Sequence, residues 1–330
     1  MSRRLSIVST LILFAFVAGA AGCSSASSPI LVPHSGAMGI QTAPLSLGTW
    51  TTKAPMPTAR QQLAAGVVNG RLYAIGGLDR VGYSNAVEAY DPATDTWSTK
   101  ASMPTARDEL AVGVVNGILY AVGGYNGISY LNTVEAYNPA TNAWTTKASM
   151  PTPRCGLAVG VVNGILYAVG GIEIHGRSDT VEAYDPATDT WTTKASLPKA
   201  RENPAAGVIN GILYAVGGYA YGGKHDNQAY NPATNTWATK ALMPTARSDL
   251  AASVLGQRLY AVGGYKNDHN RFLNTVEAYN PATDTWTTKA PMPTARDGLA
   301  TGVVADTLYA VGGNNGNCCV LNTVEAFSPR

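Results

Sequence analysis

An arginine recurs at a nearly constant interval along this chain, and arginine is well suited to binding anions. Its six copies are separated by 47, 47, 47, 46 and 49 residues. A guanidinium group can hold a carboxylate through two parallel hydrogen bonds, so arginines gathered on one surface would select acidic ligands. The six copies are Arg60, Arg107, Arg154, Arg201, Arg247 and Arg296.

The residue after each arginine varies between copies and is acidic in three of them. These acids are Asp108, Glu202 and Asp297. In an enzyme, such carboxylates are candidates for a general acid or base. In a binding protein, they would be further contacts to the ligand.

A glutamate also recurs, and it offers a structural explanation for the arginines. If the two lie close together, each copy contains a buried ion pair, because a buried charge needs a partner. A position that does not vary between repeats serves the repeat more often than a ligand. In this alternative the arginines lie between units, and the fourth copy, which has Gln228, pairs its arginine less well. The glutamates are Glu88, Glu135, Glu182, Glu277 and Glu325.

Other chemistry is sparse. Three histidines, His175, His225 and His269, fall in successive variable loops, but without the close spacing of a metal motif. We therefore expect no metal and no cofactor. We find no nucleophile triad, paired carboxylates or phosphate-binding loop. The adjacent Cys318 and Cys319 either form a vicinal disulfide or remain thiols.

These residues belong to a repeat with a period near 47. The phrase GILYAVGG occurs three times and three near-copies accompany it, each ending in two glycines. Such a period indicates a repeat architecture. All the tryptophans of the chain follow the same spacing, at Trp50, Trp97, Trp144, Trp191, Trp237 and Trp286.

One unit, read from Leu110, contains four short strands. An apolar run and the strand ILYAVGG flank Asn116-Gly117, which is a strong hairpin signal. TVEAY and WTTKAS follow, separated by a turn containing Pro139. Six such sheets bury their faces by packing radially, as a six-bladed all-β propeller over residues 48–330. The last unit lacks its Trp-containing strand, so the segment around Trp50 should complete the last blade and close the ring.

The units resemble the kelch repeat family: a Gly-Gly pair, a tyrosine 12 to 15 residues later, and a tryptophan seven residues after that. The tyrosines are Tyr90, Tyr137, Tyr184, Tyr230 and Tyr279, with Phe327 in the last unit. The resemblance implies antiparallel four-stranded blades. It also implies that the arginines ring the channel mouth and contact acidic peptides, as in kelch adaptors. Copper-radical oxidases and sialic acid mutarotases resemble this fold too, so the resemblance also leaves room for an enzyme.

Variation is concentrated in the loops between the second and third strands, and function usually resides on such loops. We predict a non-catalytic module that binds a protein or glycan ligand on this face. The alternative is a sugar- or sialic-acid-modifying enzyme, or a metal-dependent oxidase, at the channel mouth. The near-identity of the copies favours binding, so we assign no catalytic residue. The loop tyrosines suited to such contacts are Tyr83, Tyr125, Tyr130, Tyr219, Tyr221 and Tyr265.

The first 22 residues resemble a bacterial lipoprotein signal. Arg3 and Arg4 precede an apolar stretch that ends in small residues directly before Cys23. We expect the signal to export the protein to the cell envelope. Cys23 should then be lipidated, and residues 23–47 should form a flexible tether. Ser24 favours the outer membrane over the inner. Without the signal, acidic and basic side chains balance, which argues against nucleic-acid binding. We expect a monomer.

Overall fold

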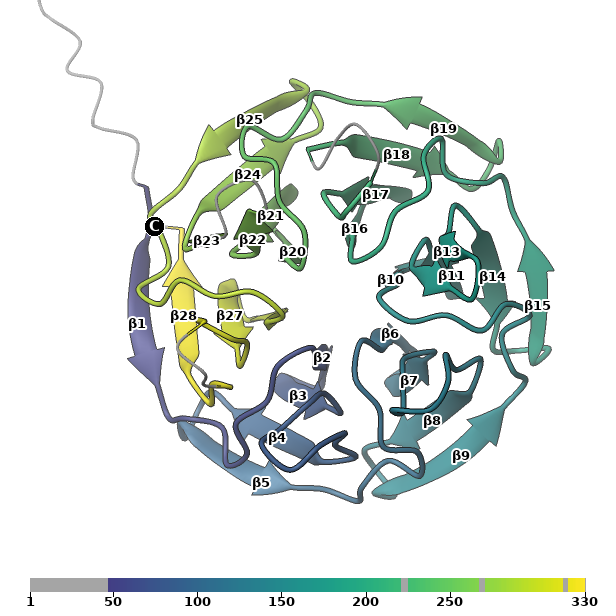
Figure 1. Ribbon diagram of the computed structural model, residues 1–330. Coiled ribbons are helices and arrows are strands. Elements are labelled where there is room, and N and C mark those ends of the chain that lie inside the picture. The colour runs from purple at the N-terminus through teal and green to yellow at the C-terminus, as the bar shows by residue number, and fades with distance from the viewer. Residues whose placement is uncertain (1–46, 221–224, 267–270, 317–319, 330) are drawn as a thin grey trace, which may run out of the picture. The chain divides into compact units, whose positions relative to one another are not determined.

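The computed structural model describes residues 47–220, 225–266, 271–316 and 320–329, and every regular element within them is a β-strand. Six four-stranded antiparallel sheets stand around a common axis as the blades of a propeller (Figure 1). The predicted all-β, six-bladed architecture is confirmed. The predicted signal segment 1–22, Cys23 and nearly all of the predicted tether lie outside the described residues. Among those described, we find no helix with the length and hydropathy needed to cross a membrane.

In blades one to five, the strands follow the chain from the innermost to the outermost. Blade one contains β2 (Ala64–Val68), β3 (Arg71–Ile75), β4 (Val87–Asp91) and β5 (Thr96–Thr99). Blade two contains β6 (Ala111–Val115), β7 (Ile118–Val122), β8 (Val134–Asn138) and β9 (Ala143–Lys147). Blade three contains β10 (Ala158–Val162), β11 (Ile165–Val169), β14 (Val181–Asp185) and β15 (Thr190–Thr193).

The second half of the ring repeats this order. Blade four contains β16 (Ala205–Ile209), β17 (Ile212–Val216), β18 (Asn227–Asn231) and β19 (Thr236–Thr239). Blade five contains β20 (Ala251–Leu255), β21 (Arg258–Val262), β24 (Val276–Asn280) and β25 (Thr285–Thr288). Blade six contains β26 (Ala300–Val304), β27 (Thr307–Val311), β28 (Val324–Ser328) and β1 (Thr49–Lys53). Short hairpins extend two variable loops: β12 (Ile172–Glu173) with β13 (Gly176–Arg177), and β22 (Tyr265–Lys266) with β23 (Arg271–Phe272).

The N-terminal strand closes the ring, as predicted. β1 pairs antiparallel with β28, and Trp50 lies opposite Phe327. The Trp50 indole N–H also donates a hydrogen bond to the carbonyl of Ala290 (2.9 Å). The innermost strands β2, β6, β10, β16, β20 and β26 contact one another in cyclic order. The ring therefore joins chain segments from both ends, and β28 is not left as an exposed edge.

Apolar side chains pack between neighbouring blades rather than within one. Glycine on the innermost strand makes this close packing possible. A Cβ added at Gly66 of β2 would lie 2.4 Å from Cδ2 of Leu119 in the next blade. On the outer strands, Tyr90 and Trp97 fill the widening wedge, with ring centroids 5.2 Å apart. Their polar tips find partners: the Tyr90 hydroxyl contacts Asp95, and the indole of Trp97 donates to a backbone carbonyl.

The two glycines that end each second strand form the junction between blades. In blade one, Gly76 and Gly77 have backbone φ angles of +62° and +101°, which residues other than glycine rarely adopt. The Gly77 N–H donates to the carbonyl of Arg107 in the next blade connection (2.9 Å). A Cβ on Gly76 would lie 2.8 Å from the same oxygen. The glycines thus hold each blade connection, and the residues that follow it, against the preceding blade.

Candidate ligand-binding site at the channel mouth

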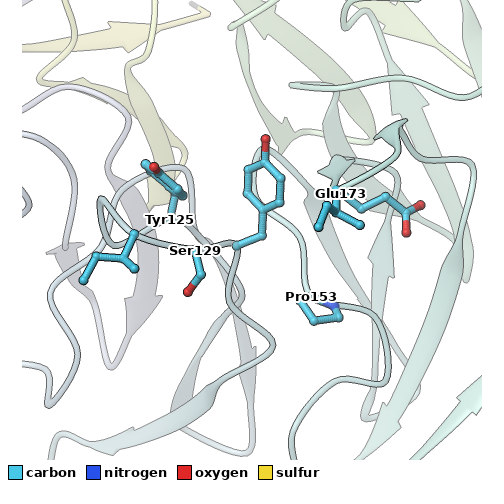
Figure 2. A pocket seen from close by; sticks show the side chains of 7 residues that line it. Tyr125, Ser129, Pro153 and Glu173 are labelled. Atoms are coloured by element: carbon cyan, nitrogen blue, oxygen red, sulfur yellow. The ribbon is translucent and has the colours of Figure 1, made fainter.

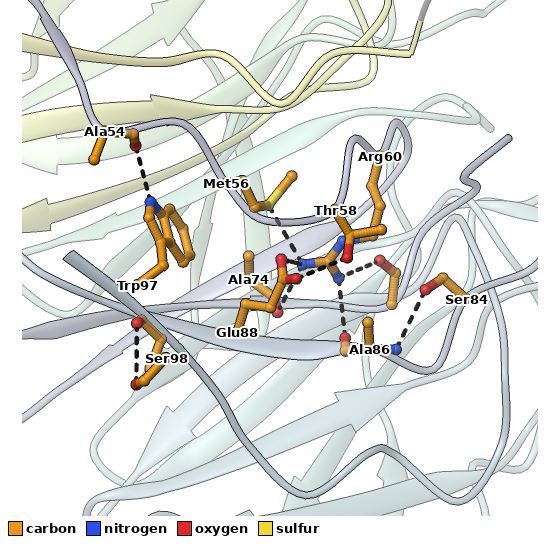
Figure 3. Close-up of polar contacts among 12 residues, drawn as sticks. Ala54, Met56, Thr58, Arg60, Ala74, Ser84, Ala86, Glu88, Trp97 and Ser98 are labelled. Atoms are coloured by element: carbon orange, nitrogen blue, oxygen red, sulfur yellow. Dashed lines mark hydrogen bonds and ion pairs between the residues drawn. The ribbon is translucent and has the colours of Figure 1, made fainter.

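The repeated arginines are buried in the blades. Arg60 is 0% exposed, and its Nη2 lies 2.7 Å from Oε2 of Glu88 (Figure 3). Its Nη1 donates to the carbonyls of Gly76 and Ala86, at 2.8 and 2.9 Å. The hydroxyl of Thr58 donates to the other oxygen of Glu88 (2.8 Å). The two charges are therefore paired with each other inside the protein.

Four other blades repeat this arrangement. The Arg-to-Glu distances are 2.7 Å for Arg107–Glu135, 3.0 Å for Arg154–Glu182, 2.9 Å for Arg247–Glu277 and 3.0 Å for Arg296–Glu325. All six arginines, including Arg201, are 0% exposed. The interpretation that these guanidinium groups ring the channel mouth and bind anions is therefore wrong, because a ligand cannot reach them. The alternative of a repeated buried ion pair is confirmed.

In blade four, a different acidic residue pairs with the buried arginine. Gln228 occupies the place of the glutamate, and Asp226, two residues earlier, takes over the charge. Asp226 lies 3.5 Å from Arg201 and 3.4 Å from Lys199. The ion pair of Arg201 is longer than those of the other five arginines, as the sequence predicted for this copy.

Two-way backbone hydrogen bonds attach each variable loop to the channel mouth. In blade two, the N–H of Asp108 donates to the carbonyl of Tyr125 (3.0 Å), and the N–H of Tyr125 donates back (2.9 Å). The same bridge forms between each residue after a repeated arginine and the first residue after a Gly-Gly pair. The fold therefore sets the first loop residue beside the variable mouth residue in every blade.

A backbone girdle runs around the mouth one residue further along. Backbone N–H groups of Gln62, Glu109, Gly156, Asn203 and Gly298 each donate to the carbonyl of the preceding blade, for example Glu109 to Gln62 at 3.0 Å and Gly156 to Glu109 at 2.8 Å. The six residues have φ between +47° and +57°, which Asn, Asp and Gly tolerate best. The girdle was not predicted from the sequence, although a polar residue or a glycine at each of its positions is compatible with a left-handed backbone. They are Gln62, Glu109, Gly156, Asn203, Asp249 and Gly298.

The mouth is acidic, contrary to the predicted ring of arginines. Burial raises the pKa of Asp108 to about 7, and Glu109 adds to the shift. Burial, assisted by Asp249, likewise raises the pKa of Asp297 to about 7. Burial also raises the pKa of Glu109, although the thiol of Cys155 donates to its Oε2 (2.7 Å) and opposes the shift. These carboxylates repel anionic ligands and favour cations or hydrogen-bond donors.

Three of the predicted tyrosines gather beside this acidic mouth. The ring centroids of Tyr83 and Tyr125 are 5.6 Å apart in an edge-on contact, and those of Tyr125 and Tyr130 are 5.7 Å apart. Gly127 makes room for Tyr83, since a Cβ there would lie 2.5 Å from the ring. The loops of blades one and two therefore share one aromatic cluster.

Two pockets meet at this cluster. The mouth pocket, of about 420 Å³, is lined by Tyr83, Asp108, Glu109, Tyr125, Tyr130, Cys155, Ile172, Glu202 and Asn203. The outer pocket, of about 530 Å³, is lined by Tyr125, Ile128, Ser129, Tyr130, Pro153, Glu173 and Ile174. Figure 2 shows Tyr125 and Ser129 on one side of the outer pocket, with Pro153 and Glu173 on the other. Tyr125 and Tyr130 line both pockets, so the two pockets adjoin at the tyrosine cluster.

The other predicted site residues lie elsewhere. Tyr219 stacks under the guanidinium of Arg177, 3.9 Å from the ring centroid, and Tyr265 packs on Phe272. Tyr221, His269, Cys318 and Cys319 lie outside the described residues. Asp297 forms a bridge with Asn314 in blade six. Within the described ranges, no three His, Cys, Asp or Glu side chains are placed to hold a metal ion.

Comparison with protein families supports the repeat assignment. The kelch motif model matches residues 59–104, 106–151, 246–293 and 295–330, and the KLHDC2/KLHL20/DRC7 kelch-repeats domain model matches residues 145–264. A curated relative, the kelch-like protein terF of Aspergillus terreus, is 44% identical over 61 residues. That match covers 17% of this chain and 13% of terF.

A solved structure has the same fold. The structure of YjhT superposes with a TM-score of 0.73, over 82% of this chain and 95% of that chain. The two sequences are 18% identical over this alignment. This likeness concerns the fold alone.

Removing a buried arginine should destabilise the propeller strongly. Arg107→Ala leaves the carboxylate of Glu135 buried and uncompensated, and we expect it to lower the free energy of unfolding by about 3–5 kcal/mol. Arg71→Ala is the matched control, because the Arg71–Asp91 pair is exposed and should be worth about 0–1 kcal/mol. Denaturant unfolding of both variants measures the difference. Equal, small losses would contradict a structural role for the buried pair.

Proposed function

This chain belongs to the kelch-repeat family, and on that premise we propose that it is a non-catalytic binding module whose ligand docks on the loops of blades one to three. Kelch propellers are typical protein-interaction modules. A rigid ring here presents loops that differ from blade to blade, while the turns at the other end of the strands hardly vary. Variation concentrated on one face of a rigid scaffold is what partner recognition requires.

The observation that carries this proposal is the pair of adjoining pockets beside exposed apolar loop tips. Val81, Ile128 and Ile174 are 98%, 88% and 83% exposed, and each lies in the variable loop of one of three successive blades. The outer pocket between Ile128 and Ile174 leads into the tyrosine cluster. Large exposed aliphatic groups next to aromatic rings mark protein contact surfaces. They offer no hydrogen bonds to sugar hydroxyls, so we favour a protein segment over a glycan as the ligand.

Charged substitutions at the outer pocket should weaken ligand binding. A screen of the purified protein against a displayed peptide library and a glycan array first identifies a ligand. Ile128→Asp and Ile174→Asp should then each weaken binding of that ligand about tenfold or more, measured by calorimetry, because they place an unpaired charge in an apolar contact.

Leu242→Asp serves as the control, since Leu242 is 49% exposed but lies in the connection into blade five. Binding that tolerates both isoleucine variants, or that falls equally in the control, would refute the proposed surface. A ligand found only on the glycan array would overturn the preference for a protein segment.

A second candidate function is a sugar-modifying enzyme at the mouth, and one specific contact favours it. Glu202 lies 3.7 Å from the guanidinium of Arg177, and both side chains are partly exposed. Burial raises the pKa of Glu202, although Arg177 opposes the shift. In such a site Glu202 acts as the general acid or base, and Arg177 beside it binds the carboxylate of an acidic sugar. Unlike the six repeated arginines, Arg177 comes from a variable loop.

The enzyme candidate predicts loss of activity in Glu202→Gln. Exchange between the anomers of sialic acid, followed by NMR, should be faster with the protein than without it. Glu202→Gln should slow that catalysed exchange about 100-fold or more if Glu202 transfers the proton. Asp306→Asn, in a hairpin turn of blade six, is the charge-matched control. Exchange at the uncatalysed rate with the unmodified protein would exclude this candidate.

We also propose that the protein is exported and held to the cell envelope through lipid on Cys23. The basic residues, apolar stretch and small residues before this cysteine support the proposal. A lipid on the new N-terminus would attach the tether, and the propeller beyond it, to the bilayer. We expect Cys23→Ser to abolish incorporation of a labelled fatty acid and to release the protein into the soluble fraction. Labelling that persists in this variant would contradict the anchor.

A further inference from the structure

One residue in the wall of the mouth pocket has a carboxylate oxygen without a hydrogen-bond partner in the described protein. Asp108 is only 6% exposed, and its Oδ1 is buried without a hydrogen-bond partner. Asp108 is also part of the pocket wall, so the unpaired oxygen lies on a residue that borders a site a ligand can enter. Buried polar atoms in native proteins almost always have a partner, and an unpaired buried charge is costly. The arrangement indicates that a donor or a cation is supplied from outside.

The rest of the wall is complementary to a cation. Glu109 and Glu202 add two further carboxylates to the same pocket. The nearby cation of the protein, Arg177, already contacts Glu202 and stacks on Tyr219. Tyr83, Tyr125 and Tyr130 contribute aromatic rings, and the face of an aromatic ring attracts a positive charge. One pocket thus combines an aromatic cluster with excess negative charge.

The size and the ligand set of the pocket favour an organic cation over a metal ion. A pocket of about 420 Å³ has room for an ammonium group together with the carbon atoms attached to its nitrogen, and is much larger than a metal ion needs. The described side chains provide no group of three metal ligands here or elsewhere. Aromatic rings select weakly hydrated cations such as alkylated ammonium, whereas a metal ion requires oxygen, nitrogen or sulfur at short range.

We propose that the mouth pocket binds an organic ammonium group, held by Asp108 and by the rings of Tyr83, Tyr125 and Tyr130. This inference deepens the proposed function, since the ammonium group belongs to the ligand that docks on the same loops. The group is either the side chain of a lysine in a protein segment or the head of a small quaternary amine. Both sources share the chemistry that the pocket recognises.

The test is a calorimetric titration of the full-length protein with three probes. Choline represents the quaternary amine, and N-acetyl-lysine methylamide represents the lysine side chain. The neutral isostere 3,3-dimethylbutanol has the shape of choline without its charge. We expect at least one ammonium probe to bind about tenfold or more tightly than the neutral isostere. The tighter ammonium probe identifies the source. Equal binding of all three probes, or no binding of either ammonium probe, would overturn the inference.

Variants of the pocket then locate the binding site. Asp108→Asn and Tyr83→Ala should each weaken the preferred ammonium probe about tenfold, whereas Tyr83→Phe should retain binding because the aromatic face remains. Tyr83 is 38% exposed, so its truncation should leave the fold intact. Asp306→Asn removes the same charge far along the chain and should have no effect. Unchanged affinity in both Asp108→Asn and Tyr83→Ala would refute the site.

The pH dependence provides a readout that a purely structural role of Asp108 would not produce. Because burial raises the pKa of Asp108 to about 7, the carboxylate loses its proton between pH 6 and pH 8. Only the ionised form attracts a cation, so affinity should rise over this range and should rise less in Asp108→Asn. Affinity that is flat with pH would count against Asp108 as the counter-ion. The charged and titratable groups that share its surroundings are Glu109, Cys155, Glu202, Arg177, Tyr83, Tyr125 and Tyr130.

Failure of this inference can be told apart from failure of the proposed function. Tyr83 and Asp108 line only the mouth pocket, whereas Ile128 and Ile174 line only the outer pocket. If no ammonium probe binds but the screened ligand still depends on Ile128 and Ile174, the docking surface holds and the ammonium site is wrong. If the ammonium probes bind as expected but no ligand depends on the isoleucines, the reverse is true.

Discussion

The rest of the structure depends on the buried ion pair that each blade connection makes with the third strand of its own blade. The guanidinium of Arg60 binds Glu88 and the carbonyls of Gly76 and Ala86, so one side chain ties the connection to two strands. The carbonyl of the next arginine, Arg107, accepts a hydrogen bond from the second glycine of the preceding blade. Each arginine thus contacts two neighbouring blades, its own through the guanidinium group and the preceding one through the backbone carbonyl.

This use of arginine decides the electrostatics of the candidate site. With all six guanidinium groups buried and neutralised, the residues that remain at the mouth set its charge, and several of them are acidic. The same backbone geometry that buries the arginine places the following residue, such as Asp108, at the channel. The sequence thus predicted a ring of cations at the mouth, whereas the folded protein has an acidic pocket there.

The blades differ from one another at positions where a change leaves the repeated four-stranded structure intact. In blade four, Asp226 replaces the missing glutamate and keeps Arg201 paired, so the blade retains its geometry. At the mouth, the backbone girdle fixes six left-handed positions, while the residue before each of them varies between blades. The variable loops of blades one and two differ from those of the other blades in joining Tyr83, Tyr125 and Tyr130 into one cluster.

The sequence alone determined the architecture of this protein, because the spacing of glycine pairs, tyrosines and tryptophans reports one structural unit repeated six times. The position of Trp50 before the first strand was enough to predict that β1 completes the last blade. The repeated glutamates also contained the correct structural role of the arginines, although sequence could not choose between that role and anion binding. Only the tertiary structure made that choice, since burial depends on the packing of neighbouring blades. It also brought Asp108, Glu202 and the three tyrosines together from three blades, and a pairing between segments so far apart leaves no periodic signal in the chain.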